Sequence, residues 1–250
     1  MRHPPLWRAC AIISISLICT AAARAGEVGA AAPVRKPNII FILIDDMGWR
    51  DLGCCGSTFY ETPNIDRLAA GGMRFTQAYA AAPVCSPTRA SIMTGKYPAR
   101  VGVTDWIGAK SAGRLLDAPY IHHLPLTEVS LAKALKQAGY QTWHLGKWHL
   151  GERNFYPDRH GFDVNVGGCE LGHQPSYFSP YRIPTLKDGP KGEFLTDRLT
   201  DEAIALIEKS DGRPFFMNFW HYAVHAPIQA PVELIQKYRD KAHRLKLDSV

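Results

Sequence analysis

The amino-acid sequence predicts an α/β fold with a mostly parallel central sheet and helices on both of its faces. Residues 38–44 and 215–220 form two apolar runs without the polar/apolar alternation of a half-exposed strand. Such runs are typical of strands that are buried on both faces of a parallel sheet. A further strand is predicted over 140–145, and segments with the apolar spacing of amphipathic helices lie between these strands.

Residues 1–25 have the features of a signal peptide. A short charged start is followed by a run over 9–23 that is nearly all apolar or small, and residues 23–25 form a small-x-small cleavage site. The run is shorter than the ~20 residues that span a bilayer comfortably, and an uncleaved amino-terminal anchor is the alternative. We therefore predict export to the periplasm or the medium, and a flexible lead-in over 26–37.

The charge of the chain excludes two classes of partner. Cleavage would remove three arginines and lower the formal net charge from +6 to +3. The remaining basic residues are scattered, without the basic stripe of a nucleic-acid-binding protein or the polybasic patch of a membrane-surface protein. We expect no nucleic-acid partner, and no membrane association once the signal peptide is cleaved.

Four cysteines remain after cleavage, namely Cys54, Cys55, Cys85 and Cys169. An even number in an exported protein is compatible with two disulfides. Cys54 and Cys55 are adjacent, so a bond between them would be strained, and a link from either one to Cys169 stays open. No cysteine or histidine spacing predicts a zinc site.

The first predicted strand ends at Asp45 and Asp46. Open α/β sheets bind their ligands at the carboxyl ends of the strands. Two adjacent carboxylates there repel each other unless a cation lies between them or backbone amides reach them, and carboxylate oxygens favour calcium or magnesium. The alternative is a simple turn or helix cap.

A thiol motif follows the first predicted helix. Thr62 and Pro63 begin that helix, residues 71–72 end it, and residues 73–80 are predicted to form a short strand. In Cys85-x-Pro87-x-Arg89 the proline suits the first turn of a second helix. Cys85 would then face free amides and the positive end of the helix dipole, which stabilise anions. The alternative is a small buried apolar residue beside a turn.

The middle of the chain contains few candidate functional residues. Residues 96–114 are predicted to form a loop at the mouth of a pocket. The adjacent His122 and His123 point in different directions and are not expected to bind a metal. Thr127 is the predicted cap of a helix that Gly139 terminates.

The strand at 140–145 leads into Gly146-Lys147-Trp148-His149-Leu150-Gly151. Strand alternation places Lys147 and His149 on one side of an extended backbone and Trp148 on the other. A lysine and a histidine that converge on one point can hold a doubly anionic group and move a proton. The alternative is a solvated sheet edge.

Residues 156–181 are predicted to be a long irregular segment that shapes substrate access. His160 and His173 in this segment, and Arg182 directly after it, are candidates for substrate contacts. An amphipathic helix with Thr196 as its cap precedes the strand at 215–220. That strand is followed by His221 and by His225-Ala226-Pro227, and a last helix-like stretch begins near Pro231.

Taken together, three motifs and the Asp-Asp pair resemble those of the sulfatase family, in the alkaline phosphatase superfamily. The motifs are Cys85-x-Pro87-x-Arg89 with Thr94-Gly95, the Gly-Lys-Trp-His-Leu-Gly string, and His225-Ala226-Pro227. The likeness covers roughly residues 36–227. Many family members carry Ser or Ala where this chain has Thr88, which is a mild departure.

The resemblance implies a mechanism and a set of roles. A formylglycine-generating enzyme would oxidise the cysteine to formylglycine, whose hydrate attacks a sulfate ester of a carbohydrate or an aryl alcohol. A divalent cation, usually Ca²⁺ with Mg²⁺ as an alternative, would be bound by the two aspartates and the modified cysteine. The proline spacing favours His225 over His221 as the sulfate contact. The implied site residues are Asp45, Asp46, Cys85, Arg89, Lys147, His149 as the base, and His225.

The resemblance also implies an incomplete site. Sulfatases normally supply another Asp with Asn, Gln or His as ligands, and a further lysine, downstream of the His-x-Pro step. No Asp-Asn pair occurs among the 23 residues after Pro227. We therefore expect residues 38–250 to be the amino-terminal part of a sulfatase catalytic domain whose carboxy-terminal part is missing. The alternatives are a phosphoester or phosphonate hydrolase of the same superfamily, and a catalytically incomplete binding protein.

Overall fold

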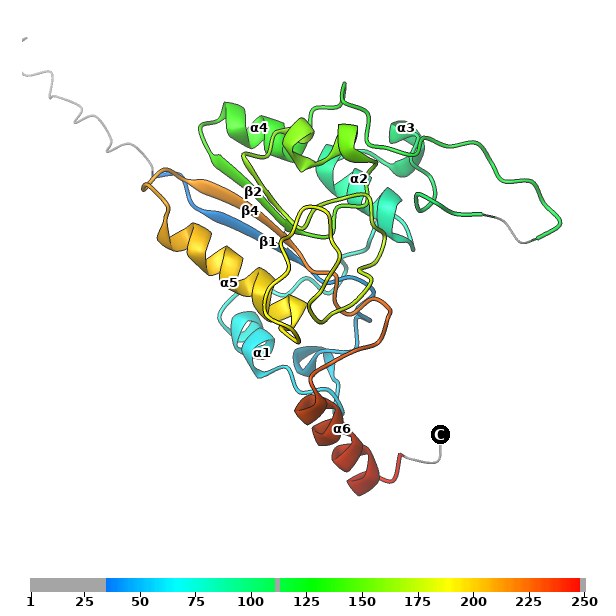
Figure 1. Cartoon of the computed structure of the whole chain (residues 1–250), viewed down its shortest axis with the longest axis vertical. Coiled ribbons are helices and arrows are strands. Elements are labelled where there is room, and N and C mark those ends of the chain that lie inside the picture. Colours follow the sequence, from blue (N-terminus) through cyan, green and yellow to red (C-terminus); the bar gives the residue numbers. More distant parts are fainter. Residues whose placement is uncertain (1–34, 111–112, 248–250) are drawn as a thin grey trace, which may run out of the picture. The chain divides into compact units, whose positions relative to one another are not determined.

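The computed structural model describes residues 35–110 and 113–247 (Figure 1). The chain divides into two compact units, 1–36 and 37–250, and every helix and strand described below belongs to the second unit. The predicted signal peptide and nearly all of the predicted lead-in lie outside the described residues.

The second unit is built on a sheet of four parallel strands in the order β1-β4-β2-β3. The strands are β1 (Ile39–Leu43), β2 (Gln141–Gly146), β3 (Val164–Val166) and β4 (Phe215–Trp220). The predicted parallel sheet is confirmed. The sequence prediction missed β3, which lies within the segment expected to be irregular.

Helices cover both faces of this sheet, as predicted. In Figure 1, α2, α3 and α4 lie on one side of the strands and α5 lies on the other. The α-helices are α1 (Pro63–Ala70), α2 (Cys85–Thr94), α3 (Pro98–Val101), α4 (Leu131–Gln137), α5 (Leu195–Glu208) and α6 (Val232–Arg244). Three short 3-10 helices cover Gly53–Cys55, Arg153–Phe155 and Pro157–His160.

The central strand β4 explains the two-sided core. Phe215, Met217 and Phe219 pack into a cluster with the apolar side of α5. Phe216 and Trp220, which point to the opposite face, pack with apolar residues of α2, α3 and α4. All six residues of β4 are buried, so a run without alternation was the correct signal for this strand.

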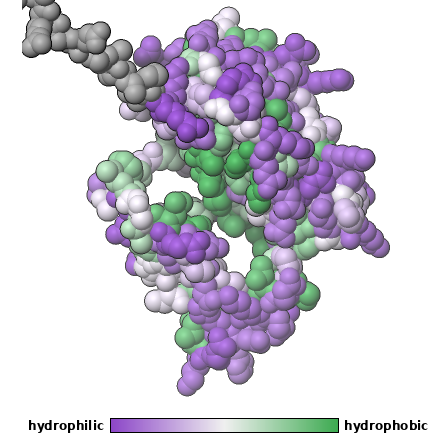
Figure 2. Space-filling view, turned by 90° about the vertical axis from the view of Figure 1, so that its left-hand side faces the viewer, coloured by the Kyte–Doolittle hydropathy of each residue, from purple (hydrophilic) through white to green (hydrophobic). Residues whose placement is uncertain are grey.

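The prediction that the first strand is buried on both faces was wrong. Ile40 and Ile42 are 47% and 51% exposed, because β1 is an edge strand and α5 packs on β2 instead. Apolar surface gathers in the middle of the face shown in Figure 2. An apolar run predicts a strand, but it does not show whether helices cover both faces of that strand.

Several local predictions were also wrong. Residues 73–80 form no strand, and Phe75 and Tyr79 are largely exposed, since no neighbouring strand pairs with this segment. The cap of α4 is Ser130, whose hydroxyl accepts from Lys133 N, and not Thr127. Helix α5 begins at Leu195, so Thr196 lies inside its first turn. The predicted loop at 96–114 contains the short helix α3.

All four cysteines in the described part of the chain carry free thiols, so the open Cys169 pairing does not occur in this structure. Among the described residues, no helix is both long enough and apolar enough to cross a membrane.

Candidate active site

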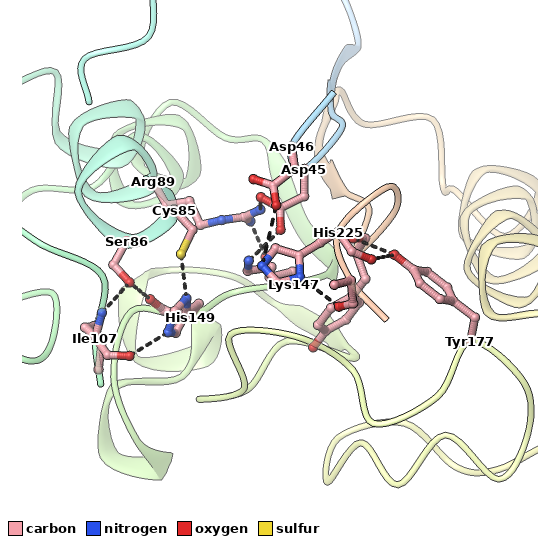
Figure 3. A network of polar contacts seen from close by, with 12 residues as sticks. Asp45, Asp46, Cys85, Ser86, Arg89, Ile107, Lys147, His149, Tyr177 and His225 are labelled. Atoms are coloured by element: carbon pink, nitrogen blue, oxygen red, sulfur yellow. Dashed lines mark hydrogen bonds and ion pairs between the residues drawn. The ribbon is translucent and has the colours of Figure 1, made fainter. Parts of the chain in front are cut away.

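Polar side chains from four segments converge at the carboxyl end of the sheet (Figure 3). The β1 end contributes an aspartate pair, the β2 end a lysine and a histidine, the β4 end a histidine, and the start of α2 a cysteine and an arginine. The residues brought together are Asp45, Asp46, Cys85, Arg89, Lys147, His149 and His225.

Asp45 is the centre of a buried ionic cluster. Its Oδ1 accepts from Arg89 Nη2 at 3.1 Å, and its Oδ2 accepts from Lys147 Nζ at 2.5 Å. Arg89 Nη1 also donates to the Lys147 carbonyl at 2.7 Å, and its guanidinium lies 5.0 Å from the centre of the Trp220 ring. The three charged side chains are almost fully buried, so the cluster is rigidly held.

The cluster carries more positive than negative charge. Burial raises the pKa of Asp45, but Arg89 and Lys147 outweigh it and leave that pKa below its ordinary value. Burial and the neighbouring Arg89 lower the pKa of Lys147, while Asp45 opposes this shift. With Asp45 ionised and both cations charged, the cluster has a net charge of +1. A buried net positive charge beside the amino end of α2 favours an anionic ligand.

Cys85 and His149 form the second half of the site. Cys85 is the first residue of α2, and its Sγ lies 3.2 Å from His149 Nδ1. His149 Nε2 lies 2.9 Å from the Ile107 carbonyl oxygen, which can only accept a hydrogen bond. The proton therefore resides on Nε2, and the lone pair of Nδ1 faces the side chain of Cys85.

His149 is held neutral and in place. Burial, together with Lys147, lowers its pKa to about 4, so the imidazole is neutral at neutral pH and Nδ1 keeps a free lone pair. Ser86 Oγ donates to the His149 carbonyl and accepts from Ile107 N, at 3.0 Å each. The backbone at Gly172 passes so close that a Cβ there would lie 2.7 Å from His149 Cε1.

The turn after β2 explains how Lys147 and His149 reach the site. Gly146 has a φ of +94°, and a Cβ at this position would overlap the Trp220 carbonyl oxygen. Trp148 is fully buried and stacks on Trp220, while Lys147 and His149 turn to the site. This division was predicted, but His149 itself has a φ of +54° and is not extended as strand alternation assumes.

Asp46 and His225 form the exposed rim of the site. His225 Nε2 lies 3.6 Å from Asp46 Oδ2, and the Asp46 side chain is 63% exposed. Asp45 fixes the histidine-bearing loop through two backbone bonds, one from Asp45 N to the Ala223 carbonyl and one from Val224 N to the Asp45 carbonyl. Tyr177 Oη donates to the His225 carbonyl at 2.9 Å from the other side.

The two aspartates are suitable ligands for a hard cation, but they are too few to complete its coordination shell. Calcium takes six to eight oxygen ligands. Within residues 35–110 and 113–247, no three His, Cys, Asp or Glu side chains gather as a metal site. Both oxygens of Asp45 are engaged by Arg89 and Lys147, whereas Asp46 is free of buried partners. Asp45 and Asp46 could therefore supply only part of a coordination shell.

The remaining histidine candidates lie elsewhere. His221 packs against Phe219 with ring centres 4.2 Å apart, and His160 is buried behind Trp148. Burial lowers the pKa of both histidines to about 4. His123 stacks on Phe155.

Two other site candidates from the sequence have different outcomes. Among the described residues, Arg182 makes no polar contact with the site, and its backbone N donates to Asp188. His173 does reach the site, because its ring is parallel to that of His225. Ser86 and the Ile107 carbonyl were not predicted as parts of the site. Ser86 is adjacent to the cysteine motif, but a backbone carbonyl has no signal in residue type.

Comparison with known proteins identifies the family. Residues 37–247 match the protein family described as Sulfatase. This chain belongs to the sulfatase family. The resemblance that the motifs suggested is therefore confirmed over most of the sequence.

Two curated sulfatases are 38–39% identical to this chain over the part that aligns with it. N-acetylgalactosamine-6-sulfatase of Mus musculus is 39% identical over 82% of the chain and 43% of its own length. Arylsulfatase G of Homo sapiens is 38% identical over 83% of the chain and 37% of its own length. The chain thus spans less than half of these sulfatases.

Solved structures agree with the fold and the family. Ps i-CgsB in complex with k-i-k-neocarrahexaose has a TM-score of 0.67 and 31% identity, over 82% of this chain and 49% of that one. BT4656 in complex with D-glucosamine-2-N,6-O-disulfate has a TM-score of 0.59 and 28% identity, over 82% and 38%. A phosphonate monoester hydrolase of Agrobacterium radiobacter, at 22% identity, shares the fold alone.

Proposed function

We propose that this chain carries the nucleophile half of a sulfatase site that hydrolyses sulfuric esters and releases inorganic sulfate. The observation that carries the proposal is the pairing of Cys85 with the neutral Nδ1 of His149 beside the positive Asp45–Arg89–Lys147 cluster. A nucleophile, a base and an anion-binding charge are the parts that sulfuryl transfer needs.

The nucleophile would be made from Cys85 by a formylglycine-generating enzyme. One hydroxyl of the formylglycine hydrate attacks sulfur, which forms a sulfated enzyme and releases the alcohol. His149 Nδ1 then removes the proton of the second hydroxyl, sulfate departs and the aldehyde re-forms. Among the described residues, the buried Nε of Arg89 has no hydrogen-bond partner, and from one helical turn beyond Cys85 it would orient the hydrate.

Residues at the ends of three strands would stabilise the negative charge of the sulfate group. Lys147 at the buried end and His225 at the rim would contact the sulfuryl oxygens and offset their developing negative charge. Asp45 and Asp46, with the modified residue 85, are the residues that would hold a divalent cation, Ca²⁺ or Mg²⁺. Such a cation, when bound, supplies Lewis-acid stabilisation of sulfate and nucleophile oxygens.

We propose a sulfated carbohydrate as the substrate. Support comes from the names of similar proteins, an N-acetylgalactosamine-6-sulfatase among them, and from two similar structures that contain carbohydrates. The signal-peptide features of residues 1–25 support a role outside the cytoplasm, in the periplasm or the medium.

Matched substrates test the reaction. The chain is produced with a formylglycine-generating enzyme, supplied with calcium, and assayed on a sulfate ester and a phosphate ester of the same phenol. We expect faster turnover of the sulfate ester. Faster turnover of the phosphate ester would instead identify a phosphoester or phosphonate hydrolase. Calcium binding by a folded chain, measured by calorimetry, with turnover of neither ester would identify a binding protein.

A further inference from the structure

The loop after β3 passes directly over the candidate site. At Gly172 the backbone lies against the His149 ring, where a Cβ would be 2.7 Å from Cε1 and 2.9 Å from Nε2. The next residue, His173, has its ring parallel to that of His225, with 6.0 Å between the ring centres and 3° between the planes. Two consecutive residues of one loop therefore contact two different histidines of the site.

The exposure of the site residues gives the direction in which a substrate must enter. Lys147 is 0% exposed and His149 is 2% exposed, whereas the His225 side chain is 25% exposed and His173 is exposed. The sulfate must reach the buried end, because the positive cluster is there. The group esterified to the sulfate then extends outward past His225, whose ring is parallel to that of His173.

The ring nitrogens of His173 are available to form hydrogen bonds with a ligand. Its contact with His225 is through the rings, and its two ring nitrogens have no hydrogen bond among the described residues. An imidazole can both donate and accept a hydrogen bond, as a sugar hydroxyl can. A small aryl group offers no such partner.

We propose that His173 is a specificity-determining residue that forms a hydrogen bond with a hydroxyl of the sugar esterified to the sulfate. This inference rests on the proposed function and deepens it, since it assigns to one residue the recognition of the alcohol part of the ester. His173 does not contact the sulfate group itself, which is bound deeper in the site.

Binding measurements test this assignment without requiring turnover. The unmodified thiol form is titrated by calorimetry with inorganic sulfate and with N-acetylgalactosamine 6-sulfate, as wild type, His173→Ala and His173→Phe. We expect both variants to bind the sugar sulfate roughly tenfold more weakly, which is the scale of one hydrogen bond. Both should bind inorganic sulfate as wild type does. His243→Ala, an exposed histidine of α6, is the matched control and should change neither affinity.

Any other pattern of affinities would contradict the proposal. If either variant binds the sugar sulfate as tightly as wild type does, the proposed hydrogen bond is wrong. If only His173→Phe does so, the sugar contacts the face of the ring instead. Equal weakening of both ligands overturns the assignment to the sugar. If wild type binds neither ligand, the anion site of the proposed function fails as well. Binding of inorganic sulfate by wild type therefore distinguishes a failure of the His173 proposal from a failure of the anion site.

Discussion

The Asp45→Asn variant is expected to lose about 3–5 kcal/mol of unfolding free energy, because it leaves two buried cations without a counter-charge. The side chains of Arg89 and Lys147 are 1% and 0% exposed, and Asp45 is the carboxylate that pairs with both. Asparagine keeps the shape of the side chain, so the loss reports charge rather than packing. Equilibrium unfolding in urea, by circular dichroism, measures it.

The neighbouring residue supplies a matched control. Asp46 has the same chemistry, but its side chain is 63% exposed and lies 3.6 Å from His225. We expect Asp46→Asn to change the unfolding free energy by no more than about 0.5 kcal/mol, as is usual for exposed positions. Equal effects of the two substitutions would show that the Asp45 cluster does not hold the site together.

The His149→Ala variant is expected to turn over a sulfate ester about 10²–10⁴-fold more slowly than wild type, the usual contribution of a general base. Its Nδ1 is 3.2 Å from the side-chain atom of residue 85, and the Ile107 carbonyl fixes the tautomer that leaves Nδ1 free to accept a proton. Steady-state rates on an aryl sulfate measure the effect on kcat.

His160→Leu is the control for His149→Ala, because it removes a buried histidine that is not the proposed base. His160 is also fully buried, but neither of its ring nitrogens has a partner among the described residues, and it packs behind Trp148. An apolar replacement removes no hydrogen bond there, so we expect turnover close to wild type. If both histidine variants retained the same turnover, His149 would not be the base.

Much of the fold was predictable because long apolar runs indicate strands. The run at 215–220 became the central strand, whose side chains fill both cores. The three residues of β3 are too few to stand out within a glycine-rich segment. The exposure of Ile40 could not be predicted, since it depends on where α5 packs. Thr127 and Ser130 are both good caps, and tertiary packing selects between them.

The candidate residues could be found in the sequence where chemistry depends on residue type. The aspartates, Cys85, Lys147 and His149 were expected near one another, and the structure brings them together. The sequence did not indicate that Arg89 would pair with Asp45, because this contact joins segments 44 residues apart. The Ile107 carbonyl could not be found at all, since any residue type supplies one.

The state of residue 85 tests the central claim most directly. The chain is produced with a formylglycine-generating enzyme, shown to hydrolyse a sulfate ester, and digested with trypsin, and the peptide of residues 75–89 is analysed by mass spectrometry. We expect a peptide lighter by the difference between a CH₂SH and a CHO group, and we expect this form to be absent from Cys85→Ala. Finding only the thiol in the active enzyme would contradict it.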